Sequence, residues 1–156
     1  MDRIYRKLKY ENMEGNSIDK TVQTTNEWLN ELGRYLGVQD KQVIYAAFKT
    51  TLTVIRDRLT IEEMADFAAE LPVLLRGAFY EAWNPAKTPL KIKHVDDLYD
   101  LFLERYNGPF VLEPKIIIPK IIGFLSRKVS AGEMKDIKSI LPKELKEFWT
   151  VSESLG

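Results

Sequence analysis

The chain has 156 residues, of which 45% are hydrophobic and 29% charged, and its 23 basic and 23 acidic side chains leave no net charge at pH 7. It contains no cysteine and one histidine, His94, which excludes disulfides and thiolate chemistry and leaves little scope for His-dependent catalysis or a His-based metal site. No part of the predicted folded body is strongly basic, so a dedicated nucleic-acid binder is not expected. We expect a single compact globular protein that is not an enzyme and has no metal or cofactor.

The apolar stretches do not indicate a membrane protein. The longest, IIIPKIIGFL at residues 116–125, is too short to cross a bilayer and contains a lysine. The basic start of the chain is not followed by the apolar run and small-residue cleavage site of a signal peptide. A cytoplasmic location with no membrane span is therefore expected.

Residues 1–20 are predicted to form an N-terminal arm. The stretch RIYRKLKY at residues 3–10 alternates cations with tyrosines, a pattern that could contact nucleic acid or an anionic membrane. Glu11 and Glu14 follow this short stretch. We therefore favour an arm that is disordered or docks on an apolar groove of the body.

Residues 21–83 are predicted to form a first half of four helices. Apolar residues at three-and-four spacing indicate a helix that begins near Thr25 and ends at Gly37, a typical left-handed cap. A second helix is expected from about residue 40 to 58. Thr60 and Glu63 fit a capping box at the start of a third helix, in which each side chain satisfies a free amide of the first turn.

A proline ends the third helix and begins the fourth. Leu71 precedes Pro72 in the stretch AAELPVLLRGAFYEAW, at residues 68–83, and a residue before proline avoids the helical region. Proline suits the first turn of a following helix. The stretch is therefore a corner between two helices, with its leucine buried.

A short, semi-stiff linker at residues 84–93 leads to a second predicted half at residues 94–156. Four helices are expected here too, with a Ser130–Glu133 capping box and a second Leu–Pro corner. The second helix of this half is less regular, because Pro119 lies inside it. Either that helix begins near Pro119 or it kinks there, and an extended conformation of KIII at 115–118 stays open.

The two halves align with each other at an offset of 70 residues without a gap. We interpret this as an internal repeat, so that the fold class is an all-α bundle of two related four-helix halves packed as one unit. Between residues 59–79 and 129–149, six positions are identical: Glu63/Glu133, Met64/Met134, Asp66/Asp136, Leu71/Leu141, Pro72/Pro142 and Leu75/Leu145.

The first corner also resembles a known family. The motif A-x-x-L-P-x-x-L-R, a helix end with Tyr and Trp, and a weaker second copy are similar to the bacterial family called domain of unknown function 2267. The resemblance covers roughly residues 24–150, and the second copy departs from the motif with Lys146 in place of the arginine. It implies an all-helical fold and supplies no activity, cofactor or catalytic residue. The residues that carry it are Ala68, Leu71, Pro72, Leu75, Arg76, Tyr80 and Trp83, with Leu141, Pro142, Glu144, Leu145 and Trp149 in the second copy.

Arg76, Tyr80 and Trp83 are the candidate binding residues. Their spacing of four and three would place them on one helix face. A guanidinium between two aromatic rings could bind a carboxylate or a phosphate. The alternative, which we favour, is structural: Arg76 caps neighbouring carbonyls while Trp83 covers the edge of the core.

The histidine and the acidic residues between positions 94 and 104 could hold a divalent ion. Acidic residues also favour the start of a helix, where they meet the free amides and the dipole. No dedicated ligand loop accompanies the group, so a solvated helix face is the preferred interpretation. Its members are His94, Asp96, Asp97, Asp100 and Glu104.

No catalytic motif is present, and the leading hypothesis is a protein–protein interaction or regulatory module. Self-association as a homodimer is its simplest version, with the aromatic helix ends around Tyr80, Trp83, Phe148 and Trp149 as anchors. The alternative is a small-molecule or anion-binding protein with a site near Arg76 between the halves. Nucleic-acid binding through the basic arm comes third and is not favoured.

Overall fold

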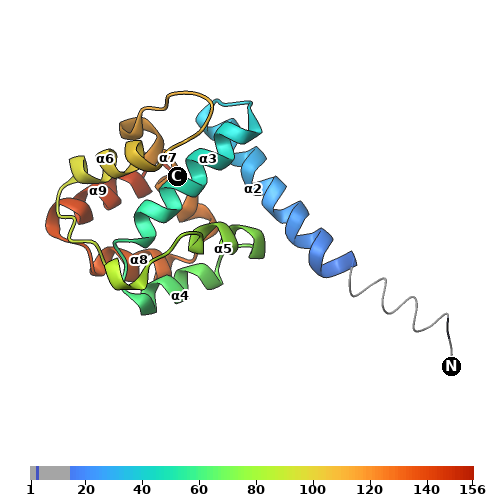
Figure 1. The fold of residues 1–156 in the computed structure, drawn as a ribbon, viewed down its shortest axis with the longest axis horizontal. Helices are drawn as coiled ribbons and strands as arrows, with labels where there is room; N and C mark the ends of the chain where they lie inside the picture. Colours follow the sequence, from blue (N-terminus) through green and yellow to red (C-terminus); the bar gives the residue numbers. More distant parts are fainter. Residues whose placement is uncertain (1–2, 4–14) are drawn as a thin grey trace.

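A computed structural model describes residue 3 and residues 15–156, and within them the chain is helical with no strand (Figure 1). The prediction of an all-α fold is confirmed. The expectations for RIYRKLKY and the rest of the N-terminal arm concern residues that, apart from Arg3 and 15–20, lie outside the described part of the chain.

Eight α-helices and two short helical turns make up the described part. α4 and α8 begin and end 70 positions apart, and so do the starts of α5 and α9. The internal duplication itself stays a prediction. The elements are η1 (Gly15–Asp19), α2 (Lys20–Leu36), α3 (Lys41–Arg56), α4 (Ile61–Ala69), α5 (Val73–Tyr80), η2 (Pro85–Lys87), α6 (Val95–Arg105), α7 (Pro114–Lys128), α8 (Ala131–Ser139) and α9 (Lys143–Glu153). None of these described helices combines the length and apolar character that a membrane crossing requires.

Helix α2 begins earlier than its apolar pattern predicts. The pattern places the start near Thr25, whereas the helix begins at Lys20 and a π-helical turn precedes it. No proline or glycine separates the two positions, so the helix extends beyond its buried stripe by adding one hydrogen bond per residue. At its other end Gly37 takes the predicted left-handed conformation, with φ of 71°.

Helix α7 contains Pro119 in its interior and begins at Pro114, so both the predicted start near Pro119 and the extended alternative for residues 115–118 are wrong. Glu113 caps the helix start by accepting from the Lys115 amide at 3.3 Å. An interior proline costs about 3 kcal/mol, but each fully buried isoleucine contributes about 1.5–3 kcal/mol. The apolar face of α7 therefore outweighs the proline, because it buries Ile117, Ile118, Ile121 and Ile122.

Both Leu–Pro sequences form corners, as predicted. Leu71 and Leu141 are buried, and each following proline occupies the cap position of the next helix. The Arg76 amide donates to the Pro72 carbonyl at 2.8 Å. The corners fold α5 against α4 and α9 against α8.

One hydrophobic core draws on both halves of the chain. Phe124 of α7 is fully buried, and its ring makes edge contacts, at 6.0 Å between centroids, with Trp28 of α2 and Phe48 of α3. Helices from the two halves pack directly on each other, as α3 does on α6 and α7, and α4 on α8. The halves therefore share their buried surface.

The linker between the halves is held against the end of α3. The Leu90 amide donates to the Asp57 carbonyl at 2.6 Å, and Arg58 Nε donates to the Ile92 carbonyl at 3.0 Å. The ring nitrogen of Trp83 donates to Thr88 Oγ1 at 3.1 Å. These bonds attach the middle and the C-terminal part of the linker to the body of the protein.

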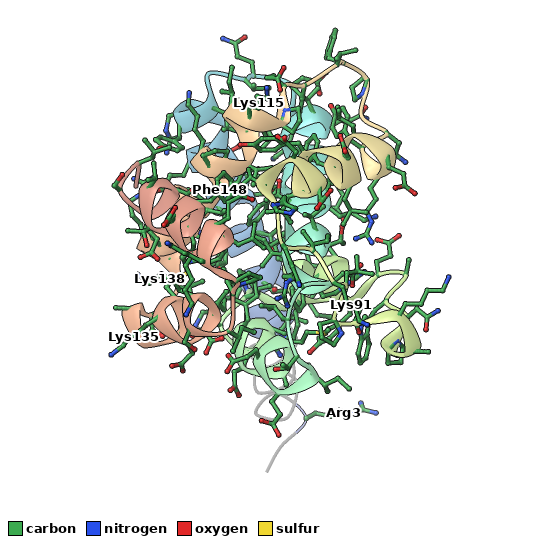
Figure 2. The ribbon with its side chains drawn as sticks, turned by 90° about the vertical axis from the view of Figure 1, so that its left-hand side faces the viewer. Arg3, Lys91, Lys115, Lys135, Lys138 and Phe148 are labelled. Atoms are coloured by element: carbon green, nitrogen blue, oxygen red, sulfur yellow. The ribbon has the colours of Figure 1, made fainter. Side chains whose placement is uncertain are left out.

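Cationic side chains are spread over the surface. The exposed lysines Lys91, Lys115 and Lys135 lie on separate parts of the molecule (Figure 2). This scattering agrees with the neutral net charge. Over the described residues labelled in that view, cations do not gather into one basic stripe of the kind that follows a phosphate backbone.

Candidate functional site

Arg76 closes the end of helix α4. Its Nε donates to the Ala68 carbonyl at 2.8 Å, and its Nη2 donates to the carbonyls of Ala69 and Leu71 at 3.3 and 3.2 Å. The last carbonyls of a helix have no partner within it. Arg76 therefore satisfies three acceptors at the corner between α4 and α5.

Tyr80 shares a face of helix α5 with Arg76, as predicted, but Trp83 does not. Helix α5 ends at Tyr80, and the chain turns through Ala82 with φ of 58° before reaching Trp83. The Tyr80 and Trp83 rings still contact each other, with centroids 5.8 Å apart. The expected common face therefore holds for Arg76 and Tyr80 only, and Trp83 contacts Tyr80 from beyond the helix end. A ligand-binding role for the three residues stays a prediction.

The aromatic helix ends offer little exposed surface to a partner. Trp149 is only 3% exposed. Tyr80, Trp83 and Phe148 are partly buried and pack against the core. The corners direct these rings inward, so the exposed apolar surface lies elsewhere.

The acidic residues near His94 belong to helix α6, and His94 is its N-cap residue. His94 Nδ1 lies 3.2 Å from Glu144 Oε2, and the same oxygen accepts from the Val95 amide at 2.9 Å. Glu144 of α9 thereby caps α6, while Asp96 and Asp97 occupy its first turn.

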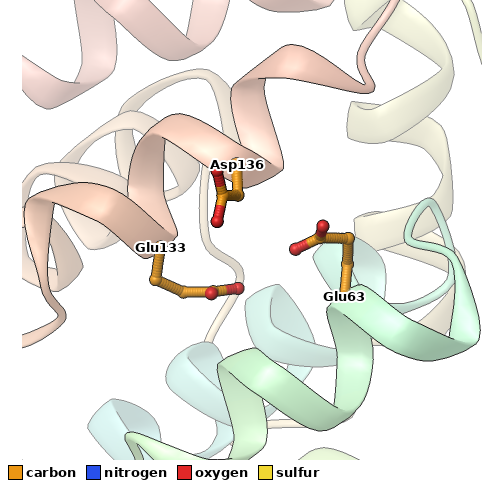
Figure 3. Close-up of side chains that lie close together, drawn as sticks. All are labelled: Glu63, Glu133 and Asp136. Atoms are coloured by element: carbon orange, nitrogen blue, oxygen red, sulfur yellow. The ribbon is translucent and has the colours of Figure 1, made fainter.

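A different set of carboxylates comes together between α4 and α8 (Figure 3). Glu63 projects from α4, and Glu133 and Asp136 project from α8 toward it. In the described part of the chain, this is the one trio of potential metal ligands whose ligand atoms all lie within 4.8 Å of one another. We call Glu63, Glu133 and Asp136 the carboxylate site.

The capping-box prediction is correct for the hydroxyls and wrong for the carboxylate of Glu133. Thr60 Oγ1 and Ser130 Oγ accept from the amides of Glu63 and Glu133, each at 3.3 Å. The Ser130 amide, which Glu133 was expected to satisfy, donates instead to Glu70 Oε1 at 2.7 Å. Glu70 of the first half accepts the hydrogen bond that a capping box assigns to Glu133. The carboxylate of Glu133 lies instead beside Glu63 and Asp136.

Burial and like charge act on Glu133 together. Its side chain is 7% exposed, and its Oε1 has no hydrogen-bond partner. Burial, followed by the negative charges of Glu63, Asp66, Glu70 and Asp136, raises the pKa of Glu133 to about 7. The pKa of Glu63 is also raised, first by burial and then by Asp136 and Asp66, while a side-chain hydrogen bond with Glu133 opposes this shift.

A second polar cluster lies at the end of α3. Arg56 and Asp57 are both buried, and Arg56 Nε and Nη2 lie 2.8 and 3.0 Å from the two Asp57 oxygens. Arg105 of α6 approaches Asp57 to 2.6 Å. The Nη1 of Arg56 donates to the carbonyls of Phe79 and Glu81, at 2.8 and 2.7 Å. A polar cleft lies beside this cluster. The guanidinium groups of Arg56 and Arg105 donate to protein acceptors, which favours a structural role.

The sequence alone does not predict the carboxylate site, because a capping box already accounts for Glu63 and Glu133. The identical pairs Glu63/Glu133 and Asp66/Asp136 were visible at the repeat offset. What the sequence did not reveal is that α4 and α8 pack against each other and bring the two acidic turns together.

The fold and site define a class: an all-helical protein of two four-helix halves that share one core and place a carboxylate site between α4 and α8. The model of the DUF2267 family, described as an uncharacterized conserved protein, matches residues 25–148, and the chain belongs to this family. This confirms the resemblance carried by the two Leu–Pro corners. A comparison with curated proteins found no match.

Proposed function

We propose that this chain is a non-enzymatic protein-binding module and that its partner is a second copy of itself. The observation that carries the proposal is a set of exposed apolar side chains around the groove between α2, α3 and α5. Ile18 is 65% exposed, Val22 42% and Leu74 49%. Exposed apolar side chains beside an apolar groove are typical of an interaction site.

The groove itself is apolar and continuous with the exposed residues. Leu29, Tyr45 and Leu74 line it, one from each of its three helices. Ile18 and Val22 precede Thr25 and Leu29 at spacings of four, three and four, so they extend the same face of the helix beyond the groove. Tyr45 is itself exposed.

Helix α2 provides the geometry for a two-fold contact. Its N-terminal part projects from the body, and its C-terminal part packs on α3 and α7 (Figure 1). A projecting segment with two exposed apolar side chains, Ile18 and Val22, and an apolar groove on the same chain suit a reciprocal contact, in which each copy places this segment in the groove of the other. A closed dimer of this kind covers both surfaces at once.

Analytical ultracentrifugation over a wide concentration range tests the proposal. We expect a concentration-dependent dimer for the wild-type chain and a monomer for Val22→Asp and for Leu74→Asp. Val151→Asp is the matched control, because Val151 is 64% exposed on α9, away from the groove. A wild-type chain that stays monomeric at the highest concentration, or a control that dissociates as readily as the two variants, would reject the proposal.

The anion-binding alternative has weaker support. Arg76 directs Nε and Nη2 to carbonyls of its own corner, so an anion would have to compete with three existing hydrogen bonds. An increase in melting temperature with phosphate or a carboxylate, lost in Arg76→Ala, would favour that alternative.

A further inference from the structure

The carboxylate site contains three potential ligands contributed by two helices. Glu63 comes from α4, whereas Glu133 and Asp136 lie three positions apart on α8 and therefore on one face of that helix. Their oxygens lie within 4.8 Å of one another, which is close enough for one ion to contact all three after small side-chain adjustments. Asp136 is exposed, so the site is open to solvent on one side.

A buried oxygen without a partner points into this site. Glu133 is more than nine-tenths buried, its Oε1 accepts no hydrogen bond, and its carboxylate is directed toward Glu63 (Figure 3). Glu63 also has a buried oxygen, Oε2, without a partner. Buried charges are normally paired or bound to a metal, because leaving them alone costs several kcal/mol.

No cation among the described residues forms an ion pair with the site. Among the ion pairs of the described residues, none involves Glu63, Glu133 or Asp136. Asp66 and Glu70 add further negative charge nearby. The three carboxylates therefore lack a positive partner within the described protein.

We propose that Glu63, Glu133 and Asp136 bind one hard divalent cation between α4 and α8. Carboxylate oxygens without imidazole or thiolate select Mg²⁺, Mn²⁺ or Ca²⁺. Water entering on the side of Asp136 would complete the coordination shell. The ion would connect one helix from each half, so its binding would hold the two halves together independently of any dimer contact.

Isothermal titration calorimetry tests the proposal directly. The chain is treated with EDTA, dialysed extensively and titrated separately with MnCl2, CaCl2 and MgCl2 at pH 8, where Glu133 is ionised. Glu133→Gln removes one ligand charge with little change in volume. Glu62→Gln is the matched control, because it removes an exposed carboxylate from the same turn of α4 outside the site.

We expect one equivalent of at least one cation to bind the wild-type chain and Glu62→Gln alike, and to raise the melting temperature of both. Loss of an outer partner of a metal ligand commonly weakens binding by about 10–100-fold, so loss of a ligand in Glu133→Gln should weaken it at least roughly tenfold. Absence of both heat and a melting shift with all three cations would overturn the proposal. Equal binding by wild type and Glu133→Gln would overturn it as well.

A second variant keeps the test decisive if Glu133→Gln fails to fold. Asp136→Asn changes an exposed residue and should leave the fold intact. We expect it to bind the same cation more weakly than the wild-type chain. Unchanged binding in Asp136→Asn would reject the site.

Discussion

Glu63 and Glu133 lie 70 positions apart in the sequence and face each other where α4 packs on α8. Each follows a hydroxyl residue that caps its helix, Thr60 in one half and Ser130 in the other. Because each helix start has a glutamate three residues after its capping hydroxyl, the packing of α4 on α8 produces a pair of opposed carboxylates. The repulsion between the two carboxylates lowers the stability of the fold only when both are ionised, so it depends on pH.

Without a bound cation, the folded chain should lose stability as the pH rises and Glu133 of the carboxylate site ionises. The pKa of Glu133 is about 7 in the folded chain, against 4.5 in its ordinary state, so the folded state binds more protons than the unfolded state between these values. The contribution of Glu133 to the free energy of unfolding is therefore highest at or below about pH 4.5 and decreases as the pH rises to about 7, by at most about 3 kcal/mol. Urea unfolding in EDTA at several pH values measures the decrease.

Glu133→Gln should remove this part of the pH dependence and stabilise the cation-free chain above pH 7. The surrounding carboxylates Glu63, Asp66, Glu70 and Asp136 are present in both proteins, so the difference between wild type and variant reports on Glu133. Glu62→Gln should retain the wild-type profile. Parallel profiles for wild type and Glu133→Gln would contradict the prediction.

Asp57→Asn should be strongly destabilising. Asp57 is buried and pairs with Arg56 and Arg105, and removing one partner of a buried ion pair typically costs about 3–5 kcal/mol. The exposed Asp100 on α6 provides a control, Asp100→Asn, for which we expect a change below about 0.5 kcal/mol. Chemical denaturation compares the two. A cost for Asp57→Asn no larger than that of the control would show that the pair is dispensable.

Arg76→Ala should destabilise the chain by about 1–3 kcal/mol, because the charged hydrogen bonds to the end of α4 are lost. Lys146 occupies the corresponding position 70 residues later and is exposed. We therefore expect Lys146→Ala to have a much smaller effect. Equal decreases in melting temperature for the two variants would show that the three hydrogen bonds of Arg76 to carbonyls do not stabilise the fold.

Phe124→Ala should destabilise the whole protein and not one half alone. Phe124 is fully buried against Trp28 and Phe48, which belong to the other half, and such a truncation costs about 3–5 kcal/mol. Circular dichroism and tryptophan fluorescence should report one common transition at a lower denaturant concentration. Phe110→Ala, at a position 61% exposed, is the control. Two separate transitions would contradict a shared core.

The helices were predictable because their signals are local. Gly37, the two capping hydroxyls and the two Leu–Pro corners each specify a boundary within a few residues, and the structure confirms them. The start of α2 was not predictable from apolar spacing, because residues before Thr25 form helix without burying a stripe.

The candidate site required knowledge that the sequence does not contain. Trp83 appeared to continue the helix of Arg76, but the chain leaves that helix after Tyr80 through the positive φ of Ala82. The carboxylate site depends on which helices of the two halves meet, and this is a long-range property of packing. Sequence periodicity reports the buried face of a helix and not the neighbour that covers it.

The tethered linker has a practical consequence for anyone who wishes to cut or tag this protein. Its attachment through Leu90 and Ile92 protects the apparent boundary between the halves, whereas Val111, in the connection between α6 and α7, is 95% exposed. A protease should therefore nick the chain inside the second half before it reaches the boundary. Because the core draws on both halves, the two fragments should remain together after cleavage and migrate as one particle until denaturant separates them.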